Sequence, residues 1–173
     1  LILSIIGCTL QYSLTFSGLN MIDASSAVLF VQFEVPFGVL IAFFWLKERP
    51  SVKNIIGLII AFSGIIVLSG APNLEGKYLG VILVLSGAFT WSFGQILAKP
   101  ISENLNGVII TAWLGVLAGP QLILASQIFE GNVIKNITSA DYHAWLIVLY
   151  LGLLMNVLGY SIWYYVLGRY PVN

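Results

Sequence analysis

Two long apolar runs meet at a short charged elbow in the first third of the sequence, and this feature constrains the fold most. The elbow is Lys47-Glu48-Arg49-Pro50, the run before it begins near Ser25, and the run after it extends to Gly70. Each run approaches the ~20 apolar residues that a helix needs to cross the hydrocarbon core of a bilayer. Pro50 cannot continue the first helix, because its nitrogen carries no hydrogen. The sequence therefore predicts two antiparallel membrane helices joined by a tight turn.

The composition extends this pattern to the whole chain. Hydrophobic residues make up 59% of the 173 residues and charged residues only 8%, whereas a soluble domain carries about 25% charge. The chain is therefore expected to be an integral membrane protein. Its seven Lys and Arg residues are scattered, so a nucleic-acid partner is not expected. The single cysteine, Cys8, lies in an apolar run, which excludes a disulfide framework or a thiolate metal cluster.

Six apolar segments are long enough to be membrane spans. Backbone groups cannot stay unpaired in lipid, so segments of this length and composition must be helices. The two-residue alternation of a barrel strand is absent. We therefore expect an all-α, multi-pass membrane helix bundle. The expected spans are Leu1–Ile22, Ser25–Leu46, Asn54–Gly70, Tyr78–Ala98, Gly107–Phe129 and His143–Gly168.

The cations predict the orientation of these spans. Cytoplasmic loops of membrane proteins carry an excess of Lys and Arg. Five cations fall on the side of the elbow and two on the other, so the elbow side is expected to be cytoplasmic in the plasma (inner) membrane. The five are Lys47, Arg49, Lys53, Lys99 and Arg169, and the two are Lys77 and Lys135.

A faint internal repeat relates the first span to the sixth. Shifting the chain by 148 positions aligns residues 1–25 with 149–173 and gives six identities, including Tyr12-Ser13 on Tyr160-Ser161. The copies are five helices apart, an odd number, so they have opposite orientations. Inverted repeats are typical of secondary transporters, whose substrate site lies near the midplane. A five-helix unit used twice predicts a ten-helix (5+5) protein, of which this chain would be a fragment lacking two helices at each end.

Several motifs of the chain resemble those of a known transporter family. The elbow and the residues after it resemble the repeat signature of the EamA family, in the drug/metabolite transporter superfamily. The later motifs are similar to the amino-acid-metabolite exporter branch. The EamA-like motifs are Leu46–Ser51, Gly57 and Ala61–Leu68, and the exporter-like motifs are Ser86–Gly94, Gly159–Trp163 and Leu167–Tyr170.

The resemblance implies a division of the chain and one departure from the family. Residues 1–71 would be the last three helices of the first EamA-type repeat, and residues 77–173 the first three helices of the second. Where some relatives carry two glutamines in the second span, this chain has Gln32-Phe33-Glu34. The departure adds a carboxyl group to that span.

Glu34 is the most informative polar residue. It lies midway along the second span, where a charged carboxylate costs about 2.5–3.5 kcal/mol to insert. It is therefore expected to face the bundle interior or a water-filled cavity. Pro36 lacks the N–H that would bond the carbonyl of Gln32, so the helix is loosened beside its acid. This pattern indicates a substrate or proton site, with a protonated, purely structural Glu34 as the alternative.

Spans four and six carry further polar and small residues. Gly80, Gly87 and Gly94 recur every seven residues, which favours close packing of helix backbones. The same packing role is predicted for Gly57, Gly64, Gly115, Gly119, Gly152 and Gly159. For Gln95, Asn156 and Tyr160, the sequence favours neither of two roles, interhelical hydrogen bonding or lining of a cavity. The candidate substrate or proton path comprises Gln32, Glu34, Trp91, Gln95, Asn156 and Tyr160.

Signals of an enzyme are missing from the sequence. His143 is the only histidine and lies at the expected water edge, so a His-based triad or two-His metal site cannot form within the chain. No Gly-rich phosphate loop with a lysine is present. We therefore expect no catalytic residues, cofactor or bound metal.

The sequence favours a secondary transporter that exports amino acids or related small metabolites by alternating access. Its partners would be the lipid bilayer and a small-molecule metabolite. Two other classes stay open at this point. One is a membrane-embedded enzyme acting on lipid or peptide, whose second catalytic group would lie outside these 173 residues. The other is a non-transporting assembly subunit whose polar residues all serve helix contacts.

Overall fold

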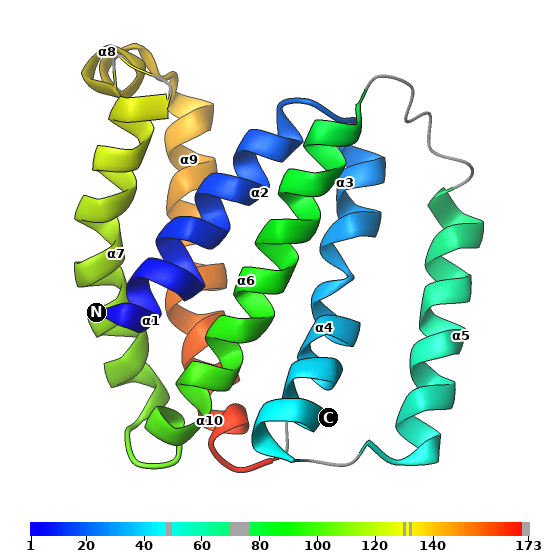
Figure 1. Ribbon diagram of the computed structural model, residues 1–173. Coiled ribbons are helices and arrows are strands. Elements are labelled where there is room, and N and C mark those ends of the chain that lie inside the picture. The colour runs from blue at the N-terminus through cyan, green and yellow to red at the C-terminus, as the bar shows by residue number, and fades with distance from the viewer. Residues whose placement is uncertain (48–49, 70–76, 130, 132, 171–173) are drawn as a thin grey trace. The chain divides into compact units, whose positions relative to one another are not determined.

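The computed structural model describes residues 1–47, 50–69, 77–129, 131 and 133–170 (Figure 1). No strand occurs among these residues, which confirms the predicted all-α class. In the labels, η marks a π-helical segment. The elements are α1 (Ile2–Ser4), η1 (Ile5–Leu10), α2 (Gln11–Leu19), α3 (Ala24–Val31), α4 (Glu34–Ile41), η2 (Ala42–Leu46), α5 (Val52–Ser69), α6 (Tyr78–Ser102), α7 (Gly107–Phe129), α8 (Val133–Ser139), α9 (Tyr142–Tyr150), η3 (Leu151–Gly159) and α10 (Tyr160–Leu167).

Five helical runs of the described chain are long and apolar enough to cross a membrane, and they confirm five of the six predicted spans. The remaining prediction, Asn54–Gly70, coincides with α5, of which Val52–Gly64 forms a shorter apolar helix; Gly70 lies outside the described residues. Its crossing stays a prediction. The five runs are Ile2–Leu19, Ala24–Leu46, Tyr78–Ser102, Gly107–Ile128 and Tyr142–Leu167.

Two predicted breaks contain more helix than expected. The expected fourth span ends at Ala98, yet α6 continues through Pro100 to Ser102. Pro100 lies in the last turn of the helix, where its missing N–H removes a single backbone bond. Side chains take up the last carbonyls: Ser102 Oγ donates to Lys99 O at 2.7 Å and Asn104 Nδ2 to Pro100 O at 2.9 Å. The predicted break at 130–142 contains the short helix α8.

The helix before the elbow ends where the sequence predicts, ahead of Pro50. Lys47 follows η2 with a left-handed backbone, φ 57° and ψ 23°, which stops the helix. On the other side, Ser51 Oγ accepts the backbone N–H of Asn54 at 3.1 Å and caps the start of α5. Glu48 and Arg49 of the elbow, and residues 70–76 between α5 and α6, lie outside the described residues.

The described residues form two compact units. The first contains Leu1–Ile5 and Leu97–Tyr170, and the second contains Ile6–Ile96. In the second unit, Ile22, Ala27 and Val84 form a buried apolar cluster. Aromatic contacts place the run of α3 and α4 between α5 and α6: Phe33 meets Phe62 at 5.0 Å and Phe37 meets Phe89 at 5.6 Å, measured between ring centroids (Figure 1).

Three glycines of α6 pack against the first span, as the seven-residue spacing predicts. A Cβ built on Gly94 would lie 2.7 Å from the Cα of Gly7, and one on Gly80 would lie 2.8 Å from side-chain atoms of Met21 and Ile22. A Cβ on Gly87 would collide with Thr15 Oγ1. The two helices run side by side in Figure 1. Their backbones approach closely because these positions have no side chain.

The same prediction is wrong for several other glycines of the described chain. A Cβ would meet nothing within 4 Å at Gly57, Gly64, Gly115, Gly119 and Gly152. At Gly159 it would meet only the carbonyl of Leu154, in the adjoining π-helical segment, at 3.5 Å. These glycines therefore do not hold two helices together in this structure.

Asp23 joins the first two spans of the second unit and caps α3. Its Oδ2 accepts the backbone N–H of Ser26 at 2.9 Å, and its Oδ1 lies 3.8 Å from the ammonium of Lys77. The hydrogen bonds from Ser26 hold the pKa of the Asp23 carboxyl below its ordinary value, and the charge of Lys77 acts in the same direction.

Asp23 should therefore make stability depend on pH in the acid range. A carboxyl with a lowered folded-state pKa stabilises the protein above its unfolded-state pKa of about 3.9, and this contribution is lost as the pH falls through the folded-state pKa. We expect Asp23→Ala to lower the unfolding temperature at pH 6, with the difference from wild type shrinking below about pH 4. Thermal unfolding across this pH range measures the effect, and a difference that grows on acidification would contradict it.

In the first unit, α7 packs closely on α10. A Cβ on Gly107, the first residue of α7, would collide with the carbonyl oxygen of Ser161 on α10. The end of α6 also approaches this helix, because a Cβ on Gly168, directly after α10, would collide with the carbonyl oxygen of Ser102. Lys99 closes this end of the unit. Its Nζ donates to the carbonyl of Leu167 at 2.9 Å and to the carbonyl of Tyr170, and its side chain is only 11% exposed. A cation there satisfies the unpaired carbonyls at the C-terminal end of α10.

Lys99→Met keeps the apolar stem of the side chain and removes its donors. We expect it to lower the free energy of unfolding by about 1–3 kcal/mol, because the part-buried carbonyl of Leu167 is left unpaired. Lys53→Met, at an exposed lysine on α5, is the matched control and should change little. Denaturant titration in mixed micelles provides the measurement, and equal effects of the two variants would exclude this role for Lys99.

Candidate substrate pathway

The second span is interrupted directly before Glu34. Helix α3 ends at Val31, a turn covers Gln32 and Phe33, and α4 begins at Glu34. Because Pro36 has no N–H, the carbonyl of Gln32 instead accepts the N–H of Val35 at 3.2 Å. The loosening that Pro36 predicts is confirmed, and it lies in the middle of the run Ala24–Leu46.

Helix α6 is attached to this interruption. The hydroxyl of Ser92, 1% exposed, shares its one proton between the backbone carbonyls of Glu34, at 2.6 Å, and Ala88, at 2.9 Å. The Glu34 side chain is half-buried, and it is the only carboxylate within the five spans. Helix α6 thus holds the backbone of the break in place. The carboxyl group of Glu34 projects from the first residue of α4.

Four of the predicted pathway residues belong to the second unit. Gln32 and Glu34 flank the break, and Trp91 and Gln95 lie one turn apart on α6, on either side of Ser92. Gln95 is buried, with 5% exposure, whereas Gln32 and Trp91 are half-buried. The bond from Ser92 to Glu34 therefore joins the two segments that carry these four residues.

The other two predicted residues belong to the first unit. Asn156 lies in the π-helical segment η3, and Tyr160 is the first residue of α10. The amide nitrogen of Asn156 donates to the carbonyl of Leu151, five residues earlier, at 3.0 Å. The ring of Tyr160 lies 6.3 Å from that of Tyr164. The grouping of these two residues with Glu34 in one path stays a prediction.

Two features of the site were not predicted from the sequence. Ser92 was not singled out, although a serine inside an apolar helix is a common interhelical hydrogen-bond donor. The π-helical segments were also missed; such segments occur frequently at functional sites. No group of three or more His, Cys, Asp or Glu side chains that could hold a metal ion occurs among the described residues.

The similarity to known proteins covers nearly the whole chain. The EamA-like transporter family matches residues 1–70 and 78–173. The chain belongs to this family. Together with the five apolar helices of the described chain, this makes it a multi-pass integral membrane protein of a transporter family.

Curated relatives from bacteria and from an archaeon are named as transporters or as an efflux pump. The "Probable amino-acid metabolite efflux pump" of Escherichia coli is 28% identical over 169 residues, which are 92% of this chain and 56% of the relative. The "Uncharacterized transporter YvbV" of Bacillus subtilis is 33% identical over 130 residues, 73% of this chain and 41% of the relative. The chain spans about half the length of the curated relatives it matches. No solved structure is significantly similar to it.

Proposed function

We propose that the complete protein is a secondary transporter that exports amino acids or related small metabolites across the plasma (inner) membrane. The family supports a membrane transporter. The printed name of the Escherichia coli relative supports export and this class of substrate. Alternating access would follow from two inverted five-helix repeats, with residues 1–71 in the first and residues 77–173 in the second.

The interruption of the second span at Gln32 and Phe33 is the observation that carries the proposal. Gln32 and Phe33 keep right-handed helical dihedrals, but the helix tightens there to bonds three residues apart, from the N–H of Phe33 to the carbonyl of Phe30 and from the N–H of Val35 to that of Gln32. A mid-helix stretch of this 3₁₀ geometry often marks a functional hinge. Here the interruption coincides with the only carboxylate of the five spans, Glu34, which directly follows it.

Each predicted pathway residue has a chemical role in this proposal. The carboxylate of Glu34 would exchange a proton or bind the amine of the substrate. The amides of Gln32, Gln95 and Asn156 would bond polar groups of the substrate. The rings of Trp91 and Tyr160 would pack against its apolar part, as aromatic walls do in small-molecule sites.

Counterflow in proteoliposomes tests the function. Vesicles containing the complete protein and loaded with unlabelled amino acid should accumulate the same radiolabelled amino acid transiently, because a carrier exchanges solute across the membrane. Protein-free vesicles are the control. If amino acids of every side-chain class and related metabolites fail to exchange, the proposed substrate class is wrong.

The orientation of the spans is a separate prediction. The excess of cations on the elbow side places Ser51 in the cytoplasm and Ser139, at the end of α8, outside. Cys8 is first replaced, and single cysteines at Ser51 and at Ser139 are then treated with an impermeant maleimide. In intact cells, the cysteine at position 139 should label strongly. The cysteine at position 51 should label only after lysis. Labelling of both from the same side would disprove the span count or the orientation.

A further inference from the structure

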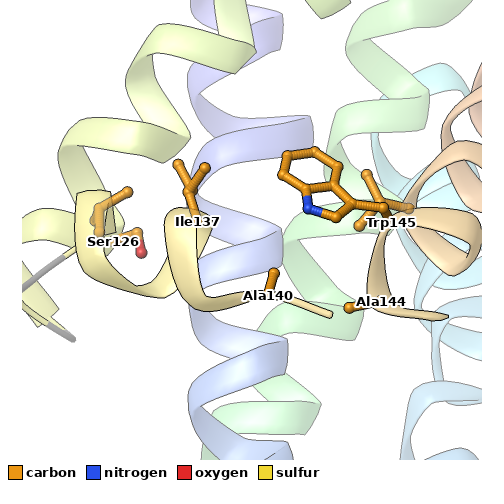
Figure 2. A pocket seen from close by; sticks show the side chains of 7 residues that line it. Ser126, Ile137, Ala140, Ala144 and Trp145 are labelled. Atoms are coloured by element: carbon orange, nitrogen blue, oxygen red, sulfur yellow. The ribbon is translucent and has the colours of Figure 1, made fainter. Parts of the chain in front are cut away.

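A cavity of about 410 Å³ opens where α7, α8 and α9 meet, within the first unit (Figure 2). Its volume is in the range of roughly 300–1,000 Å³ that small-molecule sites occupy. Three small side chains, Ser126, Ala140 and Ala144, leave the space unfilled. Figure 2 shows the indole of Trp145 extending from α9 toward the side of Ile137. The lining consists of Ser126, Val133, Ile137, Ala140, Ala144, Trp145 and Val148.

The cavity lies at one end of two membrane spans. Ser126 is three residues from the end of α7, and Val148 is six residues into α9. At a rise of 1.5 Å per residue, the lining reaches about 5–9 Å into the spans. This is the depth of the boundary between lipid headgroups and acyl chains, where interfacial helices bury their apolar faces by ~5–10 Å.

The short helix α8 has the polarity of an interfacial segment. Val133 and Ile137 are four residues apart, on one face of the helix, and both line the cavity. Lys135 lies between them in sequence, on the opposite face, and is exposed. An apolar face turned to the cavity and a cation turned away from it fit a helix that lies along the membrane surface.

The lining favours an apolar occupant over water. Six of its seven residues have apolar or aromatic side chains, and a buried water needs two to four polar partners (about three on average). The cavity is also continuous with the apolar surface of the spans. Val148 and Ile137 remain 56% and 48% exposed, and Val148 is followed on α9 by the exposed Leu149 and Tyr150.

We propose that the cavity beneath α8 binds an acyl chain of a membrane phospholipid. The chain enters along the exposed face of α9 and lies against Ile137, Ala144 and Val148. The headgroup stays at the water edge, where the indole of Trp145 has the amphipathic character of an interfacial anchor. The site holds one end of α7 and α9 together through lipid, independently of the proposed transport pathway.

Photolabelling tests the site. The complete protein is reconstituted in vesicles of phosphatidylethanolamine and phosphatidylglycerol in which one acyl chain carries a diazirine. We expect label in peptides that contain Ile137, Ala144 and Val148. Ala144→Phe fills the cavity and should reduce this label about tenfold, the loss expected when roughly two methylene groups are excluded. Ile147→Phe adds an aromatic side chain on the same helix outside the lining and is the matched control.

A second pair of measurements keeps the proposal falsifiable. Ser126→Leu fills the cavity from α7 and should reduce the label as Ala144→Phe does. If one of the two variants fails to fold, the other still tests the site. A diazirine amino acid in place of Ala140 should form an adduct with lipid. Unchanged label in both filling variants, equal loss in Ile147→Phe, or an adduct at position 140 with a protein segment would each overturn the proposal.

Discussion

Glu34→Gln should abolish the pH dependence of transport by the complete protein and slow transport at the wild-type optimum at least about tenfold. The side chain keeps its shape and can still form neutral hydrogen bonds, but it loses the charge-assisted bond of the carboxylate and can no longer change charge. Losing one bond to a charged group, worth about 1.5–3 kcal/mol, corresponds to a rate change of this size. Because Glu34 is the only carboxylate in the five spans, another carboxyl of these spans cannot replace it. The measurement is flux in proteoliposomes as a function of pH.

Glu103→Gln is the matched control for this experiment. Glu103 is an exposed acid beyond the end of α6, 3.8 Å from Lys99, and its substitution should leave the flux profile unchanged. The purely structural alternative for Glu34 makes the opposite prediction. In that case Glu34→Gln behaves as wild type, and Glu34→Leu lowers stability by leaving a partner unpaired. A wild-type pH profile for Glu34→Gln would remove Glu34 from the mechanism and leave the amide and aromatic residues as the site.

The parts of the fold that follow from local chemistry could be predicted from the sequence. Segment length and the scarcity of charged residues identify five spans, because lipid leaves the backbone no alternative to a helix. Pro36 identifies the break beside Glu34, because a missing N–H acts within its own helix. The elbow likewise ends its helix ahead of Pro50.

The parts that depend on a partner helix could not be predicted in the same way. The sequence gives Gly94 and Gly115 the same packing role, yet only Gly94 meets another backbone. Ser92 also depends on its partner, since its role comes from the carbonyl of Glu34, 58 residues away. The extension of α6 past Pro100 depends on side chains that bond the last carbonyls. The spacing of residues along the sequence describes a single helix. A contact between two helices also depends on where the neighbouring helix lies.

The glycines of α6 provide the second large effect, on stability. Gly94→Ala would place its Cβ 2.7 Å from the Cα of Gly7, and backbone cannot rotate away as a side chain can. We expect a loss of about 1–3 kcal/mol in the free energy of unfolding, as for overpacked cores, and a larger loss for Gly94→Leu. Gly115→Ala, where nothing lies within 4 Å, is the matched control. It should be neutral or stabilising by up to about 1 kcal/mol, because alanine favours a helix over glycine.

A double-mutant cycle separates close packing from a general intolerance of α6 to substitution. The Cβ of Gly87→Ala would collide with Thr15 Oγ1, which Thr15→Ala removes, although Thr15 N and Gln11 O remain at 3.2 and 3.3 Å. Gly87→Ala should therefore destabilise the Thr15→Ala protein less than the wild type, with a coupling of about 0.5–3 kcal/mol between the two sites. Gly94→Ala should not be relieved by Thr15→Ala, because its neighbour is the backbone of Gly7. Additive effects at Thr15 and Gly87 in denaturant titration would show that the two helices do not meet there.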